Sequence, residues 1–336
     1  MQQTLPYHLD HQETGEPAYL AAARRAPSAH NAQPWRLYSQ TEGSYLLSYA
    51  YADKLLADPD DRDALLGIGA FYESLALAAQ LEGKQALFEP GVEQKAHGLE
   101  LGHVRVIPLE AGTPPDPLAL FLSLRQTNRH LYDRTPLSPQ LRRDLLQLGC
   151  TLLTPREVAP LVSKASVMAW KDWRFVTDLS EWTRFKGDPA DGMTCECLHL
   201  SWLDQQALRF ALWRGKLATP LAWLYAQRDV LLTRQSAAIA VLAAENREPL
   251  TLFECGRRLL RAWVTINAQG FSYHPISIVI DQPTVKELAR MAGVADPVAI
   301  FRVGHTHKAA AWSNRRGPGS LIRRVDYDSF RSSSPR

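Results

Sequence analysis

A 20-residue segment that is apolar on most of its circumference constrains the fold more than any other feature of the chain. Residues 64–83 read ALLGIGAFYESLALAAQLEG, and Asp58-Pro59-Asp60-Asp61 stands just before them. Carboxylates and proline are typical of a helix start, and Gly83 is typical of a helix end. A helix that is apolar all round must be covered on all sides. The sequence therefore predicts a layered fold with this helix inside it.

Strand and helix patterns alternate along the rest of the chain. A short Ala-rich helix is expected over 16–26, and two strands over 35–40 and 44–51 are joined by a turn that contains Gly43. Other strands or extended segments are expected over 99–109, 237–245, 271–280 and 298–306, and other helices over 251–270 and 283–293. This pattern predicts a mixed α/β or α+β fold packed by long helices.

The segment EAGTPPDP (110–117) is the best internal boundary, because it combines glycine with three prolines and has no apolar periodicity. It separates a first half, 1–113, from a second half, 114–330. Within the second half, residues 155–235 are mostly helical and form a candidate lid. Their six tryptophans are interpreted as packing anchors, with lining of a planar-ligand pocket as the alternative. Residues 331–336 are expected to be a disordered tail.

Composition excludes several functional classes. The 336 residues carry a formal net charge of +3 at pH 7, which is too balanced for a general nucleic-acid binder. Four cysteines do not make a disulfide framework, and Cys195-x-Cys197 has no second pair at zinc-finger spacing. The N-terminal residues lack a signal-peptide pattern, and no apolar stretch is long enough to be a membrane span. These observations favour a cytoplasmic protein that does not act at a membrane.

The densest polar segment is 27–35, PSAHNAQPW, between a predicted helix and a predicted strand. It offers hydroxyl, imidazole and amide groups between two prolines that restrict its backbone, which suits a polyhydroxylated or heterocyclic ligand. Ordinary turn chemistry is the alternative, because serine and asparagine are common in turns.

Two further segments carry arginines. Arg125-Gln126-Thr127-Asn128-Arg129 places two guanidinium groups around a hydroxyl, which fits a phosphate site, although a solvated basic helix end has the same spacing. The run 304–318, GHTHKAAAWSNRRGP, could add Arg315 or Arg316 to that phosphate, or could be a surface loop.

No metal site is predicted. His305-x-His307 has no third ligand at helical spacing. The sequence also lacks G-x-G-x-x-G, the P-loop motif, G-x-S-x-G and H-E-x-x-H, so it offers no support for those nucleotide-binding loops or hydrolytic sites.

The segment APSAHNAQPWRL (26–37) resembles the signature of the nitroreductase family of FMN flavoproteins, which is close to APSxxNxQPW. RQTNR (125–129) is similar to that family's RRSxR motif, with threonine in place of serine. FSYHPIS (271–277) and VGHTHKAAAWSNRR (303–316) are similar to its flavin-ring segment and its closing basic segment. Residues 135–235 are poorly covered.

The order of the two main motifs departs from the family pattern, in which the arginine motif comes first. Ordinary members are homodimers that build each site from both subunits. One copy of each motif in reversed order resembles a double-length branch, in which two fused subunits keep one site. The fold implied is α+β, with a central, mainly antiparallel sheet and two pseudo-repeated halves in one chain.

The resemblance implies that both halves contribute to one FMN site, as a monomer by fusion or as a homodimer. The cofactor-binding residues carried over from the motifs are Ser28, His30, Asn31, Gln33, Arg125, Thr127, Arg129, Pro275, Ile276, Ser277, and Arg315 or Arg316. No catalytic side chain is implied, because a backbone N–H near Ser277 faces flavin N5 in the family.

The activity implied by the resemblance is the passage of a hydride from NAD(P)H through FMN to a small electron-poor acceptor, such as a nitro compound or a quinone. Two alternatives remain open. One is an FMN-dependent dehydrogenase or oxidase of a specialised substrate, and the other is a protein that binds and sequesters FMN without reductase activity.

Overall fold

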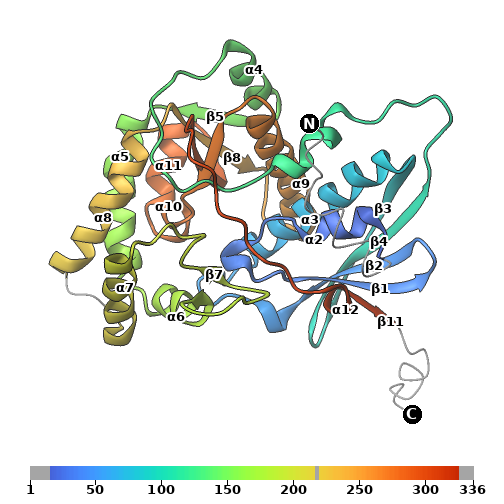
Figure 1. Cartoon of the computed structure of the whole chain (residues 1–336), viewed down its shortest axis with the longest axis horizontal. Coiled ribbons are helices and arrows are strands. Elements are labelled where there is room, and N and C mark those ends of the chain that lie inside the picture. The colour runs from blue at the N-terminus through green and yellow to red at the C-terminus, as the bar shows by residue number, and fades with distance from the viewer. Residues whose placement is uncertain (1–15, 216–218, 325–336) are drawn as a thin grey trace.

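The computed structural model describes residues 16–215 and 219–324, and its strands form two main sheets (Figure 1). The first sheet belongs mostly to the N-terminal third of the chain, and its strand order is β11-β1-β2-β4-β3. Its members are β1 Trp35–Thr41, β2 Ser44–Ala50, β3 Lys84–Lys95, β4 Gly98–Pro108 and β11 Ile322–Arg324. All pairs are antiparallel except β1 with β11. The C-terminal strand therefore completes the sheet of the first half.

The second sheet is fully antiparallel, with the strand order β5-β8-β10-β9. Its members are β5 Cys150–Leu153, β8 Ala238–Ala244, β9 Ser272–Pro275 and β10 Asp296–Gly304. The alanine-, isoleucine- and valine-rich strand β8 lies between two neighbours and is almost entirely buried. A separate two-stranded parallel pair joins β6 Thr183–Arg184 to β7 Met193–Thr194.

Two long helices join the sheets into one body. Helix α3 (Arg62–Leu81) comes from the first half and α9 (Pro249–Ala268) from the second. Their backbones touch where glycines face them: a Cβ on Gly69 would lie 1.9 Å from the carbonyl oxygen of Phe253, and one on Gly256 would lie 2.1 Å from that of Leu66. Only glycine permits this approach, and a single buried apolar cluster runs through both halves.

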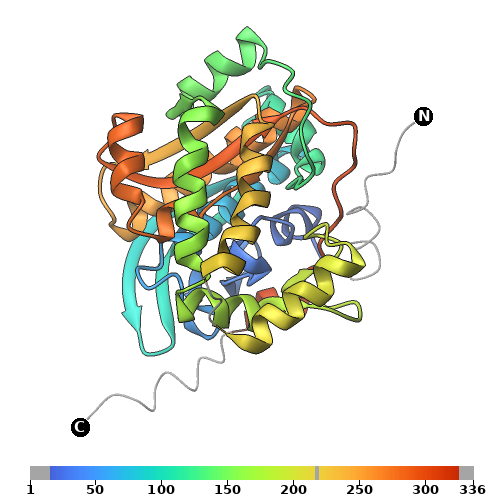
Figure 2. The ribbon, with the colours of Figure 1, turned by 90° about the vertical axis from the view of Figure 1, so that its left-hand side faces the viewer.

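The remaining helices lie around this centre. They are α2 Ala18–Arg24, α4 Pro139–Gln147, α5 Pro155–Ala169, α6 Trp173–Trp182, α7 Trp202–Arg214, α8 Thr219–Arg234, α10 Ile278–Asp281, α11 Val285–Ala292 and α12 Pro318–Leu321. Three short 3-10 helices cover Ala29–Asn31, Tyr51–Asp53 and Pro117–Leu124. Figure 2 shows α5 and α8 side by side in front of the second sheet, with α7 crossing below them.

Most of the predicted elements are confirmed, including the buried helix, the hairpin over 35–51 and the helical region 155–235. The mixed, mainly antiparallel fold packed by long helices is confirmed as well. The strands are divided between two sheets rather than gathered in one central sheet. Strands β3 and β5 were not predicted, because exposed β3 lacks clear apolar alternation and β5 has only four residues.

Two expectations were wrong in part. The extended segment 271–280 ends at Pro275, and the chain then turns into α10. The tryptophans of 155–235 are not all packing anchors: Trp170 is buried, but Trp173, Trp202, Trp213 and Trp223 each expose between 54% and 77% of their surface. The expected tail, 331–336, lies outside the described residues.

Helix α3 is the one described helix whose length and apolar composition would allow it to cross a membrane. Most of it is buried inside the protein, as a core helix should be.

Candidate functional site

The 27–34 loop connects α2 to β1 in an unusual backbone conformation. His30, Asn31 and Gln33 all have positive φ, at 50°, 57° and 55°. Such left-handed conformations are uncommon for residues other than glycine, and they persist only where the surroundings hold them. The Ser28 hydroxyl accepts the Gln33 N–H at 3.0 Å and closes the loop. The loop therefore holds three residues other than glycine in a strained backbone conformation, and such strain is common at functional sites.

The side chains of this loop have two destinations. Ser28 and His30 line a large cavity. The Asn31 amide instead donates to carbonyls in the 187–193 loop and at Asn314, both at 3.1 Å. The Gln33 amide donates to the same loop at 2.9 Å and accepts the N–H of Arg316 at 2.9 Å. These two amides hold segments of the second half against the first.

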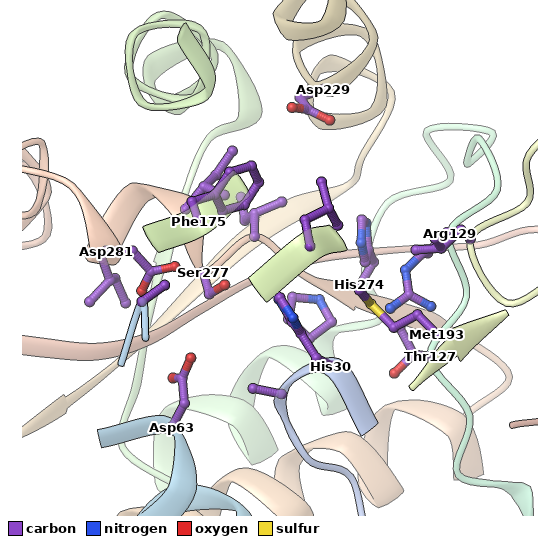
Figure 3. Close-up of a pocket in the computed structure, with 18 of the residues that line it drawn as sticks. His30, Asp63, Thr127, Arg129, Phe175, Met193, Asp229, His274, Ser277 and Asp281 are labelled. Carbon is purple, nitrogen blue, oxygen red and sulfur yellow. The ribbon is translucent and has the colours of Figure 1, made fainter. Parts of the chain in front are cut away.

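The cavity has a volume of about 790 Å³, within the range of sites for cofactors and substrates. Both halves line it, and α6, α7 and α8 line part of it as well. Figure 3 shows His30 near the middle, with Thr127, Arg129 and His274 toward one end and Asp63 and Asp281 toward the other. Of the predicted site residues, those that line the cavity are Ser28, His30, Thr127, Arg129, Pro275, Ile276 and Ser277.

Arg125 and Arg315 lie together just outside this lining. Both guanidinium groups donate to the carbonyl oxygen of Arg25, at 2.8 Å from Arg125 and 3.2 Å from Arg315. Arg125 also donates to the hydroxyl of Tyr273 at 2.9 Å. The Nε of Arg315 is buried and has no hydrogen-bond partner among the described residues. Burial, together with the charges of Arg125 and Arg25, lowers the pKa of Arg315 well below its usual value.

Arg129 points into the cavity and donates to the carbonyl oxygen of Cys197 at 2.8 Å. Burial lowers its pKa as well. Within the described residues, no carboxylate lies within 4.0 Å of Arg125, Arg129 or Arg315. Buried cations without counter-charges are costly, and such sites are suited to anions. These three arginines are called the unpaired arginine cluster below.

Arg316 does not belong to this cluster. It forms ion pairs with Asp53 and Asp191, both at 2.9 Å. Its charge is therefore compensated within the protein. Of the two alternatives considered from the sequence, Arg315 is the one without a carboxylate partner in the described structure.

The segment 275–277 passes along the cavity wall at the end of β9. The Ile276 N–H donates to the carbonyl oxygen of Ile300 at 3.0 Å, which holds it against β10. Ser277 then precedes α10 and lines the cavity. The N–H groups of Val279, Ile280 and Asp281 donate to the carbonyl oxygens of Ile276 and Ser277, whereas the Ser277 N–H has no backbone acceptor among the described residues.

Comparison with known proteins finds relatives that are similar to this chain over most of its length. No profile of a known protein family matches it. It is 24% identical over 326 residues to the "Probable NAD(P)H nitroreductase PigM" of a Serratia species, covering 88% of this chain and 89% of the relative. A Mycobacterium tuberculosis H37Rv protein, also named as an NAD(P)H nitroreductase, is 26% identical over 298 residues, covering 85% and 83%. The resemblance to nitroreductases is confirmed.

Solved structures give weaker overlaps. The FMN-bound nitroreductase of Bacteroides fragilis covers 63% of this chain and 100% of its own, with 11% identity and a TM-score of 0.37. A nitroreductase-type structure from Anabaena variabilis covers 87% of this chain and 74% of its own, with 9% identity and a TM-score of 0.43.

An acidic group at the other end of the cavity was not predicted as part of the site. Arg62 is buried and pairs with Asp63 at 2.7 Å and with Asp281 at 2.6 Å, while Asp58 accepts the N–H of Ala64 at 3.0 Å. Burial, together with Asp63, raises the pKa of Asp58 to about 7, and burial raises that of Asp281 to about 6. The DPDD run was interpreted only as a helix start.

Two more cavity residues were also missed. His274 is half-buried and accepts a hydrogen bond from Arg302 Nε at 3.0 Å, and burial together with the charge of Arg302 holds its pKa well below its usual value. Asp229 on α8 accepts the Ser166 hydroxyl at 2.6 Å, and burial raises its pKa. His274 is in β9 and Asp229 is in α8, and only the fold shows that these elements pack against the cavity. His274 does lie within the FSYHPIS segment.

Proposed function

We propose that this protein is an FMN-dependent oxidoreductase that takes electrons from NAD(P)H and gives them to a small electron-poor acceptor, such as a nitro compound or a quinone. The observation that carries the proposal is the unpaired arginine cluster beside a cavity of about 790 Å³. Three arginines with no carboxylate partner among the described residues favour an anionic ligand, and the cavity has room for a bulky ring system. The NAD(P)H nitroreductase relatives support the same activity.

The residues present fit FMN. Arg125, Arg129 and Arg315, with the hydroxyl of Thr127, would hold its phosphate, because guanidinium forks match phosphate oxygens. Binding would transfer the Arg125 and Arg315 donors from the Arg25 carbonyl to a full negative charge. The buried Nε of Arg315 would also gain a partner.

The ring system would lie in the cavity between the 27–34 loop and the 275–277 segment. His30 Nδ1 and Trp263 Nε1 are buried without hydrogen-bond partners in the part of the chain that the structure describes, and both residues line the cavity. Burial lowers the pKa of His30, so its imidazole is neutral at neutral pH and can donate or accept toward a heterocycle. Ser277 would contribute its backbone at the same wall.

When bound, FMN supplies the redox chemistry, which explains why no side-chain nucleophile or paired acid and base is required. The chain would bind and orient the ring and keep water away from it. The lining from α6, α7 and α8 is largely apolar and includes Phe175, Leu208 and Phe210. These side chains would receive the apolar body of the acceptor or the nicotinamide.

We further propose that 1–113 and 114–330 are interlocked halves that build one FMN site per chain, with 155–235 covering it. The shared core and the placement of β11 in the first sheet support this division. Either a monomer by fusion or a homodimer is compatible with it. We place the protein in the cytoplasm, with small molecules as partners and without a role in nucleic-acid binding.

The proposal is tested with purified full-length protein. FMN should copurify with it or bind when added, and NADH or NADPH should bleach the flavin band under anaerobic conditions. Addition of a nitroaromatic compound or a quinone should then restore the band. A protein that binds no FMN would overturn the proposal.

Two other results would assign a different function. Bound FMN that dithionite reduces but NAD(P)H does not would rule out the reductase. Slow reduction by one class of organic substrate would then identify a dehydrogenase or oxidase. The absence of reduction by any donor other than dithionite would identify a flavin-sequestering protein.

A further inference from the structure

A cluster of metal-binding side chains lies outside the cavity, at the end of β10. Asp133, His305 and His307 each offer a ligand atom, and these atoms all lie within 4.8 Å of one another. The sequence shows His305-x-His307 but no third ligand nearby. The fold supplies it from a residue 172 positions earlier in the chain. Two imidazoles and one carboxylate form a common set of ligands for transition metals.

Backbone contacts fix the two segments that carry these ligands. The Asp133 N–H donates to the carbonyl oxygen of His305 at 3.0 Å. One carboxylate oxygen of Asp133 accepts the Thr135 N–H at 3.0 Å, and the other lies 2.6 Å from Nδ1 of His305. The rings of His305 and His307 are 4.6 Å apart, centre to centre, and nearly perpendicular. The cluster is therefore held by the backbone on both sides.

We propose that Asp133, His305 and His307 bind a divalent transition metal, with Zn²⁺ as the probe of choice. Nitrogen ligands favour Zn²⁺, Ni²⁺ or Cu²⁺ over Mg²⁺ and Ca²⁺, which prefer oxygen. Asp133 and His307 are exposed and His305 is half-buried, so a metal can enter from solvent and keep water in its remaining positions.

The position of the site gives the metal a structural consequence. Asp133 follows the segment that carries Thr127 and Arg129, and the two histidines precede the segment that carries Arg315. A bound metal would link these two segments through coordinate bonds to its ligands. It would therefore stabilise the folded protein by an amount that grows with the logarithm of the metal concentration, because the ligands are gathered only in the folded state.

The experiment uses chelator-treated, tag-free, full-length protein, titrated with Zn²⁺ by calorimetry and with Co²⁺ by visible absorption. We expect one saturable site per chain, d–d bands of a low-symmetry nitrogen and oxygen site, and a melting temperature that rises with Zn²⁺. Asp133→Asn, His305→Ala and His307→Ala should each weaken binding at least tenfold.

The control is His103→Ala, which removes a half-buried histidine of the first sheet that contacts Gln40. It should bind Zn²⁺ like the unmodified protein. His307→Gln provides a second variant at the site if His307→Ala does not fold. The proposal is overturned if the unmodified protein shows no saturable binding, or if His103→Ala weakens binding as much as the site variants do. Unchanged binding in all three site variants would overturn it too.

Discussion

The two ends of the cavity use arginine in opposite ways. At one end, Arg62 is buried among carboxylates and pairs with Asp63 and Asp281. At the other, Arg125, Arg129 and Arg315 donate to backbone carbonyls, and Arg125 also to a tyrosine hydroxyl. The first arrangement satisfies its own charge and maintains the fold. The second leaves positive charge without a carboxylate partner among the described residues, and we propose that a ligand phosphate neutralises it. The two kinds of arginine therefore differ in their counter-charges.

The largest effect is expected from Arg62→Ala. This change leaves Asp58, Asp63 and Asp281 crowded in a buried region without their cation, and breaking a buried ion pair typically costs about 3–5 kcal/mol. Chemical denaturation should show a loss of stability of that order. Arg247→Ala, at an exposed ion pair with Asp296, is the matched control and should change stability by less than about 1 kcal/mol. An Arg62→Ala protein as stable as the control would contradict the comparison.

Replacing both Arg125 and Arg315 by alanine is expected to weaken ligand binding without lowering the stability of the protein. Each charged hydrogen bond to phosphate contributes about 1.5–3 kcal/mol, so FMN affinity should fall on the order of 100-fold or more. The melting temperature of the FMN-free protein should stay the same or rise, because two neighbouring positive charges are removed. Fluorescence titration with FMN measures the affinity. Unchanged FMN binding would remove both arginines from the phosphate site.

The acidic end predicts an unusual pH dependence of stability. Asp58 and Asp281 have folded-state pKa values of about 7 and about 6, above the ordinary value of 3.8. The folded protein therefore holds more protons than the unfolded chain between about pH 4 and pH 7, and these groups stabilise it most at the acidic side of that window. Their contribution is lost as the pH rises through 6 and 7.

Thermal melts between pH 5 and pH 8 check this dependence. Asp58→Asn keeps an oxygen to accept the Ala64 N–H but cannot titrate, so it should flatten the decline in melting temperature toward pH 8. Arg247→Ala should leave the slope unchanged. A slope that Asp58→Asn does not alter would assign the dependence to other groups.

The smallest effect is expected from Asp229→Asn. Asp229 is an acidic residue without a counter-charge, in contrast to the unpaired arginine cluster. It lines the cavity and has no ion-pair partner among the described residues. If the acceptor binds against α8, an aromatic acceptor carrying an amine should lose affinity severalfold, while a neutral analogue of the same shape should not. The ratio of the two KM values measures this. An equal change for both acceptors would assign Asp229 a structural role.

Much of the fold follows from local sequence. Apolar patterns predicted three elements correctly: the buried helix α3, the hairpin of β1 and β2, and the central strand β8. In each of them the apolar residues are spaced so that one type of secondary structure buries them. The exposed strand β3 and the short strand β5 have no such pattern, since pairing with neighbours defines them. The exposed tryptophans of α6–α8 were misjudged because sequence shows that an aromatic side chain is present but not which way its helix turns.

The residues of the proposed site were found from sequence motifs, but the partners of its polar and charged groups were not. The motifs led to the loop with Ser28 and His30 and to the arginines of 125–129. They did not indicate that Asn31 and Gln33 would hold the 187–193 loop, or that Arg316 would pair with Asp53 and Asp191. The sequence also did not indicate that Asp133 lies beside His305. These partners are distant in sequence, and only the tertiary fold brings them together.

The pairing of β11 with β1 has a consequence for synthesis of the protein. Arg315 lies on a segment that leaves the second sheet after β10, contacts Asn31, Gln33 and Asp53 of the first half, and then pairs with β1 at residues 322–324. A chain whose translation stops before residue 322 would contain both motifs and nearly the whole core, yet only these loop contacts would hold its Arg315 segment against the first half. If FMN binds as proposed, such a truncated chain should retain it less well.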